Sequence, residues 1–196
     1  MTIHFTSDLH FGHKAMAAHR GFGTDVEGMD NALRHGWNHR VSPDDTTYVL
    51  GDLSFHKLEQ TSRLLRGLNG KIIVVPGNHD NPKMLEALEK QGLIETARQL
   101  LEVKFVRQVA GKSEAHHFVL CHYPILQWNR RHYGAIHLHG HSHGSCRYPG
   151  GENPGRVMDV GVDAIGMIPL SLGGVFDIML QREATSADHH KITSAA

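Results

Sequence analysis

Cysteine is scarce in this sequence, and that scarcity argues against a scaffold held together by disulfide bonds. Cys121 and Cys146 are the two cysteines among 196 residues, and neither belongs to a Cys-x-x-Cys arrangement. Small secreted domains that rely on disulfides carry more cysteines at closer spacing. We therefore expect both thiols to be reduced.

The sequence also lacks a long apolar run and an excess of charge of either sign. No segment approaches the ~18 apolar residues of a membrane span, and Met1 to Asp8 lacks the pattern of a signal peptide. Lysine plus arginine equals aspartate plus glutamate at 20 each, so no overall field favours long nucleic acid or an anionic membrane. We expect a cytoplasmic protein with neither partner, and its oligomeric state stays open.

No internal repeat and no low-complexity linker divides the chain, so we expect a single domain. A balance of 40% hydrophobic and 20% charged residues supports one packed core. The apolar pattern ends near Glu183, which predicts a domain over residues 1–182 and a disordered tail over 183–196. In that tail, His189-His190 is expected to be a solvated pair.

Short β-rich runs alternate with segments of helical period, which predicts an α/β fold. Apolar residues recur at helical steps over 26–37, with Thr24 or Asp25 as the N-cap, and a second helix begins at Pro82. Residues 172–180 follow helical spacing after Ser171, although Gly173-Gly174 leaves a strand possible. The expected strands are residues 2–7, 46–50, 71–75, 100–106, 117–121, 135–138 and 157–162.

Histidine is abundant, with 18 copies, and five polar blocks follow predicted strands. Loops at the carboxyl ends of strands in open α/β sheets gather polar groups at one place. An aspartate and a histidine two residues apart on an extended segment point to the same side, so both can bind one cation. The blocks are Asp8-Leu9-His10, Gly51-Asp52, Gly77-Asn78-His79-Asp80, His122 and Gly140-His141-Ser142-His143.

These blocks, in this order, resemble those of the calcineurin-like metallophosphoesterases, and the resemblance extends over about residues 3–172. It implies an α/β sandwich of two central β-sheets flanked by helices (αββα), without a cap domain. It also implies a dinuclear metal centre that hydrolyses phosphate esters. One ion would be bound by Asp8, His10, Asp52 and His143, and the other by Asp52, Asn78, His122 and His141. His79 would be the catalytic histidine, oriented by Asp80, and Asp52 would bridge the ions.

The donor types suit two divalent transition-metal ions, because imidazole favours Mn, Fe, Zn or Ni over Mg or Ca. Manganese is the expected cofactor by resemblance. Each block taken alone is more often a turn or a cap, so the prediction depends on their conjunction. Two readings stay open beside a phosphodiesterase for small or nucleotide-like substrates. They are a phosphomonoesterase of the same fold and a non-catalytic scaffold that retains the metal site.

The segment after His122 is rich in aromatic and basic residues and is predicted to contact substrate. Arg130 or Arg131 could bind a phosphate, and Trp128 or Tyr133 could stack on a base, although a solvated connector is as good a reading. His137 and His139 alternate with apolar residues and are expected to share a face that supports the loop of His141. Asp159 replaces an asparagine common in similar proteins.

Overall fold

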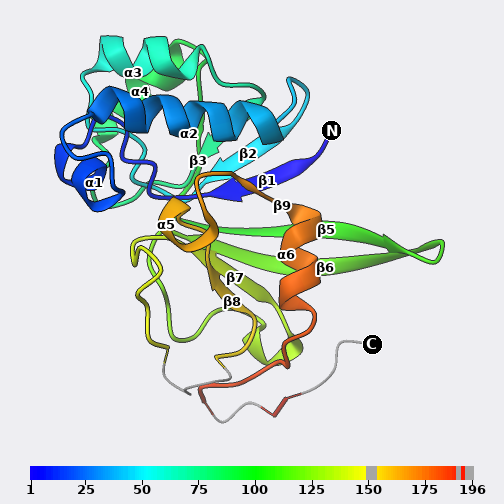
Figure 1. Ribbon diagram of the computed structural model, residues 1–196. Helices are drawn as coiled ribbons and strands as arrows, with labels where there is room; N and C mark the ends of the chain where they lie inside the picture. The colour runs from blue at the N-terminus through cyan, green and yellow to red at the C-terminus, as the bar shows by residue number, and fades with distance from the viewer. Residues whose placement is uncertain (149–153, 189–190, 193–196) are drawn as a thin grey trace.

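The computed structural model describes residues 1–148, 154–188 and 191–192, and it contains two β-sheets that face each other (Figure 1). The first sheet has five strands in the order β4-β3-β2-β1-β9, and the second has four in the order β5-β6-β7-β8. Helices cover the outer face of the first sheet, and one further helix packs on the core between the sheets. The predicted α/β sandwich of two central sheets flanked by helices is confirmed.

The first sheet is built mainly from parallel strands joined by helices. Its parallel strands are β1 (Ile3–Thr6), β2 (Thr46–Val49), β3 (Lys71–Val74) and β4 (Glu95–Thr96), and β9 (Leu170–Ser171) pairs antiparallel with β1. The connecting helices are α1 (Lys14–His19), α2 (Val26–Arg40), α3 (Leu58–Leu65) and α4 (Pro82–Lys90). In a parallel sheet, the loops that follow the strands lie at the same edge of the sheet, which places the polar blocks near one another.

The second sheet begins with a long hairpin that extends beyond the sandwich (Figure 1). Its strands are β5 (Leu100–Val109), β6 (Lys112–Cys121), β7 (Ile136–His139) and β8 (Val157–Asp159). β5 and β6 are antiparallel, whereas β6, β7 and β8 are parallel. The predicted strands 100–106 and 117–121 were too short, because the exposed part of the hairpin is polar and lacks an apolar signal. The predicted strand 157–162 was too long, since it turns after Asp159.

Local sequence explains where the helices begin. The Asp25 side chain accepts a hydrogen bond from the Gly28 amide at 2.8 Å and caps α2, as predicted. Pro82 occupies the first turn of α4. Ser171 caps α6 (Leu172–Met179), so the segment that could also have been a strand is a helix. Helices α1 and α3, the short α5 (Val162–Ile165) and the 3-10 turn η1 (Arg131–Tyr133) had not been predicted.

Two large apolar clusters hold these layers together. Met29, Leu33 and Trp37 of α2 are buried against the outer face of the first sheet. Phe5 and Phe118 stack across the space between the sheets, and Phe176 of α6 meets Phe118 edge-on. A smaller cluster on the far side of the second sheet contains Val119, Trp128, Ala135 and Val157. The segment after His122 thus covers a sheet face that no long helix covers.

Part of the predicted tail contacts this segment. The Thr185 hydroxyl is 3.0 Å from the Arg131 guanidinium, and the Gln127 amide donates to Asp188 at 2.6 Å. His189-His190 lies outside the described residues. None of the helices in the described part of the chain is both long and apolar enough to cross a membrane.

Candidate metal centre

All five polar blocks meet at the carboxyl ends of strands from both sheets. The blocks of Asp8, Asp52 and Asn78 follow β1, β2 and β3, and those of His122 and His141 follow β6 and β7. The two sheets therefore contribute to one group of side chains, although their residues are up to 135 positions apart in the sequence. The convergence predicted from the strand ends is confirmed for all five blocks.

A first group consists of Asp8, His10 and His143, whose ligand-type atoms all lie within 4.8 Å of one another. The Nε2 atoms of His10 and His143 are each 3.9 Å from Asp8 Oδ1, and the two imidazole rings stack with centroids 5.1 Å apart. Asp52 Oδ2 lies 3.6 Å from His10 Nε2. These four residues are the set predicted to bind one ion.

A second group surrounds the other side of Asp52. Asp52 Oδ2 is 3.5 Å from His122 Nε2, and Asp8 also belongs to this group. Asn78 Oδ1 is 2.8 Å from His122 Nε2 and 2.9 Å from His141 Nδ1. The predicted second set is thus assembled, with Asp8 as an addition. Asp8 and Asp52 are therefore the carboxylates shared by both groups.

The environment of these side chains fits positive ions. Asp8 and Asp52 are buried side by side, and burial raises the pKa of Asp8 to about 6. Burial, with the nearby His143, lowers the pKa of His10 to about 3, and neither ring nitrogen of His10 has a hydrogen-bond partner among the described residues. A buried carboxylate pair and a neutral imidazole without partners are costly when uncompensated. Divalent cations would supply the missing charge and the missing partners.

The backbone of the predicted ligands adopts an unusual conformation. Among the described residues, seven that are not glycine have positive φ, and five of these are predicted ligands, with φ from 48° to 68°. They are Asp8, His10, Asp52, His141 and His143. The expectation that an extended segment aligns Asp8 and His10 was therefore wrong. Left-handed turns do so instead, at a cost of about 1–3 kcal/mol each, which is typical of functional sites.

Glycines allow these turns to pack in direct backbone contact. A Cβ atom on Gly51 would lie 2.5 Å from His122 Nδ1, and one on Gly140 would lie 1.9 Å from Ser7 Oγ. Gly51 also has a φ of +93°, which side chains rarely allow. Gly51 and Gly140 therefore have the same role on the two sheets, since neither position has room for a side chain.

Hydrogen bonds behind the ligands fix which ring nitrogen faces the centre. His122 Nδ1 lies 2.7 Å from the Leu50 carbonyl, so this nitrogen is the donor and Nε2 is free to act as a ligand. His143 Nδ1 lies 2.6 Å from Asp163 Oδ2, and this hydrogen bond raises the pKa of His143. Both rings therefore turn Nε2 toward the carboxylates.

Arg20 connects this support to the backbone of the first block. Its Nε and Nη2 atoms each donate to Asp163 at 2.8 Å, while Nη1 and Nη2 donate to the carbonyls of Leu9 and Asp8 at 2.9 and 2.7 Å. Although burial opposes it, the bonds from Arg20 and His143 hold the pKa of Asp163 well below its usual range. The sequence reading missed Arg20, because an arginine in a short helix–loop segment carries no motif.

Asp80 has a different role from the one predicted. Its carboxylate accepts hydrogen bonds from the backbone amides of Asp52, Leu53 and Gly77, each at 2.9 Å. It therefore ties the second block to the third and does not orient the His79 ring. Asp159 works similarly, since it accepts bonds from the amides of Gly144 and Gly161.

His79 lies at the surface beside the first group. Its ring is 5.8 Å from the His10 ring, and its backbone amide donates to Asp52 Oδ1 at 2.9 Å. The side chain is exposed and adjoins the predicted ligands, which is the position that a proton donor to a bound substrate requires. His13 caps α1 and accepts a 3.1 Å hydrogen bond from the Met16 amide.

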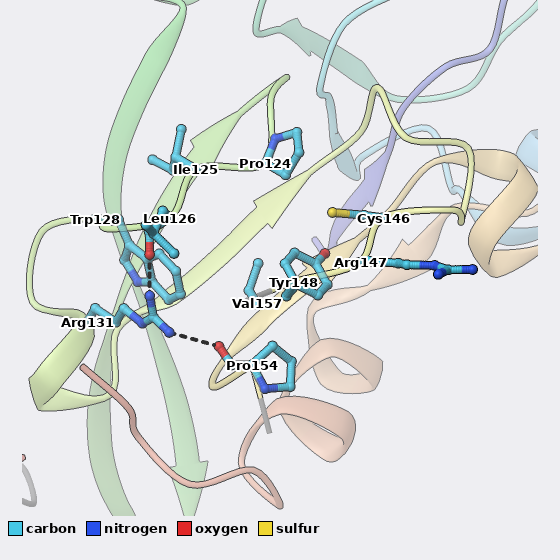
Figure 2. A pocket seen from close by; sticks show the side chains of 10 residues that line it. All are labelled: Pro124, Ile125, Leu126, Trp128, Arg131, Cys146, Arg147, Tyr148, Pro154 and Val157. Atoms are coloured by element: carbon cyan, nitrogen blue, oxygen red, sulfur yellow. Dashed lines mark hydrogen bonds between the residues drawn. The ribbon is translucent and has the colours of Figure 1, made fainter. Parts of the chain in front are cut away.

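The prediction that Arg131 contacts substrate is wrong. Figure 2 shows its guanidinium turned to the carbonyls of Leu126 and Pro154, and it also lies 4.6 Å above the buried Trp128 ring. Trp128 donates to the Ala135 carbonyl at 3.0 Å and cannot stack on a ligand. Both residues line a separate cavity of about 300 Å³ on the far side of the second sheet.

Arg130 also lies away from the predicted ligands. Its guanidinium is 5.1 Å above the exposed Tyr133 ring, and its charge helps to lower the pKa of His117, after burial. Arg130 and Tyr133 precede the start of β7, whereas the His141 block follows its end. A four-residue strand therefore separates them from the centre.

His137 and His139 do support the loops, as expected. Both are buried, and their rings lie 5.4 Å apart on one face of β7. His137 accepts from the Ile125 amide at 3.3 Å, and burial lowers its pKa to about 4. His139 bonds to the Gly140 carbonyl at 2.7 Å and to the Tyr148 hydroxyl. These contacts fix the loop that bears His141.

The chain is similar in sequence to proteins of mycobacteriophages and of an archaeon. It is 31% identical to an uncharacterized protein of Methanocaldococcus jannaschii, over 87% of this chain and 86% of that protein. It is 30% identical to the gene 66 protein of Mycobacterium phage D29, over 83% of this chain and 88% of that protein. The chain belongs to the gene 66 protein family. The gene 66 protein of Mycobacterium phage L5 shares 29% identity over 89% of this chain and 92% of its own length.

A solved structure shares this fold. A protein of unknown function from Aquifex aeolicus superposes with a TM-score of 0.62 over 90% of this chain and 98% of its own, at 21% identity. At that identity the likeness shows the fold alone. The sequence matches no family profile.

Asp52→Asn should weaken metal binding by both groups at once. An amide has no negative charge to share between two cations, so we expect affinity for Mn²⁺ to fall by more than about tenfold for each ion. Competition with a fluorescent chelator measures this. Asp44→Asn, at an exposed aspartate, is the control. Two ions bound with unchanged affinity would show that Asp52 is not shared.

Arg20→Ala should weaken metal binding without removing a ligand. Without the Arg20 guanidinium, Asp163 and the carbonyls of the first block lose their hydrogen-bond donor. Hydrogen bonds that hold metal ligands in place typically contribute 10- to 100-fold in metal affinity. Arg20→Lys keeps the charge but not the bidentate geometry, so we expect an intermediate loss. The same titration measures both variants, with the exposed Arg40→Ala as control. Unchanged affinity in Arg20→Ala would contradict the supporting role.

Proposed function

We propose that this chain is a metal-dependent hydrolase of phosphate esters, of the calcineurin-like metallophosphoesterase type. Two divalent transition-metal ions would be its cofactors, with manganese first and iron, zinc or nickel as alternatives. Its substrates would be small or nucleotide-like phosphodiesters. A phosphomonoesterase and a non-catalytic scaffold are the outcomes that the experiments below distinguish from it.

The carboxylate of Asp52 is the observation that carries the proposal. It lies between two groups of donors, 3.6 Å from His10 Nε2 and 3.5 Å from His122 Nε2. A site for one ion needs a single closed set of donors, whereas two sets that share a carboxylate are typical of centres for two ions. Two divalent cations held there would activate a water molecule and neutralise the phosphoryl oxygens.

The side chains around the centre divide the remaining work. Asp8 and Asp52 hold negative charge in place, and the neutral Asn78 adds an oxygen without further charge. His79, exposed beside His10, can give a proton to the leaving oxygen. Arg20 and Asp163 fix the ring of His143. No side-chain nucleophile is needed in this arrangement.

Residues 140–144 are Gly-His-Ser-His-Gly, which fits the Gly-x-Ser-x-Gly pattern of serine hydrolases. Catalysis by a serine nucleophile is therefore the competing mechanism. The nucleophile elbow with this pattern is a sharp strand-to-helix turn. Here β7 ends at His139, and the described residues 140–148 form turns without a helix. The Ser142 amide bonds to the Gly140 carbonyl at 2.8 Å in a local turn. The local backbone favours the metal-based mechanism.

The exposure of several predicted ligands supports a substrate with extended groups on the phosphorus. Asn78, His79 and His141 are all exposed. An uncovered centre can accept a phosphodiester whose two substituents reach outward, whereas a small metabolite is usually enclosed. This is the reason for preferring phosphodiesters over monoesters.

Metal-stripped protein supplied with Mn²⁺ tests the function. The panel compares 4-nitrophenyl phosphate, its bis ester, 2′,3′-cyclic nucleotides and single-stranded DNA. We expect no turnover without metal, restoration by Mn²⁺, and faster turnover of the bis ester than of the monoester. Turnover by fully metal-free protein would contradict the proposal. The absence of turnover with each of manganese, iron, zinc and nickel would contradict it as well. Faster turnover of the monoester would identify a phosphomonoesterase.

His79→Ala should retain two metal ions but lose about 10²- to 10⁴-fold in kcat on alkyl esters. An alkoxide is a poor leaving group and needs a proton, whereas 4-nitrophenolate leaves without one. We therefore expect a smaller loss on nitrophenyl esters, measured by steady-state kinetics with metal content as the control. Equal losses on both would indicate electrostatic stabilisation, and no loss would remove His79 from the site.

A further inference from the structure

Two exposed aromatic rings flank the candidate metal centre, and neither belongs to a polar block. Among the described residues, the exposed aromatic side chains are Phe55, Tyr123 and Tyr133, with 43%, 44% and 42% of their surface accessible. The first two contact imidazoles of the centre. Single exposed apolar side chains are common on protein surfaces, so what distinguishes these two rings is their position beside the centre.

Phe55 lies on the side of the first group. Its ring centroid is 5.4 Å from that of His10, 4.1 Å from His13 and 5.2 Å from His79. The backbone holds it there, because the Phe55 amide donates to the Phe11 carbonyl at 2.8 Å and the His13 ring is fixed as a helix cap. The ring is exposed but well positioned.

Tyr123 lies on the side of the second group. Its ring centroid is 5.1 Å from that of His122 and 4.9 Å from that of His141. It directly follows His122, whose ring is fixed by the Leu50 carbonyl. Among the ring contacts of the described residues, Phe55 and Tyr123 share no imidazole neighbour, so each ring lies beside a different group of donors.

We propose that Phe55 and Tyr123 are stacking platforms for the two substituents of a phosphodiester, so that the substrate carries planar groups, such as nucleobases, on both sides of the phosphorus. This inference rests on the proposed function. Every base has a π-face, and aromatic side chains stack on bases without regard to sequence. Phosphate bound at the centre would direct one substituent toward each ring.

The position of His79 assigns each platform its substituent. His79 contacts Phe55 and lies beside the first group, and its imidazole would protonate the leaving oxygen. The leaving substituent therefore lies over Phe55, and the substituent that stays on the phosphorus lies over Tyr123. Each aromatic residue should then affect a different part of the substrate.

Two esters with one leaving group separate the platforms. Thymidine 5′-(4-nitrophenyl phosphate) and methyl 4-nitrophenyl phosphate differ in the retained substituent alone. With Mn²⁺-loaded wild-type protein, we expect the thymidine ester to have a KM lower by roughly 5- to 100-fold, the usual range for one stacked base. Thymidine 5′-phosphate, the product that keeps this substituent, should inhibit more strongly than methyl phosphate by a similar factor.

Tyr123→Ala should bring the KM ratio of the two esters and the inhibition ratio of the two products close to one, because the KM of the thymidine ester and the inhibition constant of thymidine 5′-phosphate should rise. Tyr123→Phe should preserve both ratios. Phe55→Ala should instead raise KM for both esters by the same factor, because both present a nitrophenyl group to that side. Tyr133→Ala, at an exposed ring that lies under Arg130, is the matched control and should change nothing. Thermal midpoints and bound metal are measured for every variant.

The outcomes distinguish this inference from the function on which it rests. Hydrolysis of both esters with equal KM by the wild type, or an unchanged ratio in Tyr123→Ala, would overturn the stacking platforms and leave the hydrolase intact. A loss confined to kcat in Tyr123→Ala would overturn them too. Hydrolysis of neither ester under any metal condition would overturn the proposed function and this inference with it.

Discussion

Two carboxylates buried side by side are the constraint on which the rest of this structure depends. Asp8 and Asp52 are almost inaccessible to water, and the ring nitrogens of His10, which lies near both, have no hydrogen-bond partner in the described part of the chain. Like charges in a poorly polar environment repel each other strongly. The surrounding chain must hold them together by other means, and the features of the centre can be understood as parts of that support.

The support acts mainly on the backbone of the loops. Asp80 receives three amides from two different loops, and Arg20 binds two carbonyls of the first loop. Gly51 and Gly140 let the loops approach to distances that a Cβ would forbid. The strain of the left-handed residues is tolerated because so many independent contacts fix the same backbone. A rigid frame of this kind costs little further ordering when a ligand binds.

The convergence of the five blocks was predictable because their residues follow strands, and strand ends converge in parallel sheets whatever the details of the loops. The α2 cap and the convergence of the five blocks were predictable for this reason, since apolar periodicity and strand order are strong signals. Backbone conformation within the blocks was not predictable, because nothing in Asp-x-His distinguishes an extended segment from a left-handed turn. The substrate-binding role predicted for Arg131 was wrong, because the sequence does not distinguish an arginine that is buried and binds carbonyls from one that binds phosphate.

The roles of Asp80 and Arg20 illustrate a further limit. An aspartate beside a catalytic histidine suggests a dyad, but the side chain of the next residue along a turn points elsewhere, here to amides of a distant loop. Arg20 becomes meaningful when Asp163, far away in the sequence, is seen to lie between it and His143. Tyr123 and Phe55 were hidden for the same reason, since exposure beside a distant ring is a property of the folded chain.

The distribution of the donor residues along the chain has a consequence for biogenesis. Asp8 is near the amino terminus of the described domain, whereas His143 and its support Asp163 come from the second sheet. A chain emerging from the ribosome presents the first loop long before the second sheet exists, and contacts so distant in sequence form late. If the centre holds metal ions as proposed, the nascent chain could not bind them in their final coordination during most of its synthesis, and insertion of metal would be one of the last events in maturation.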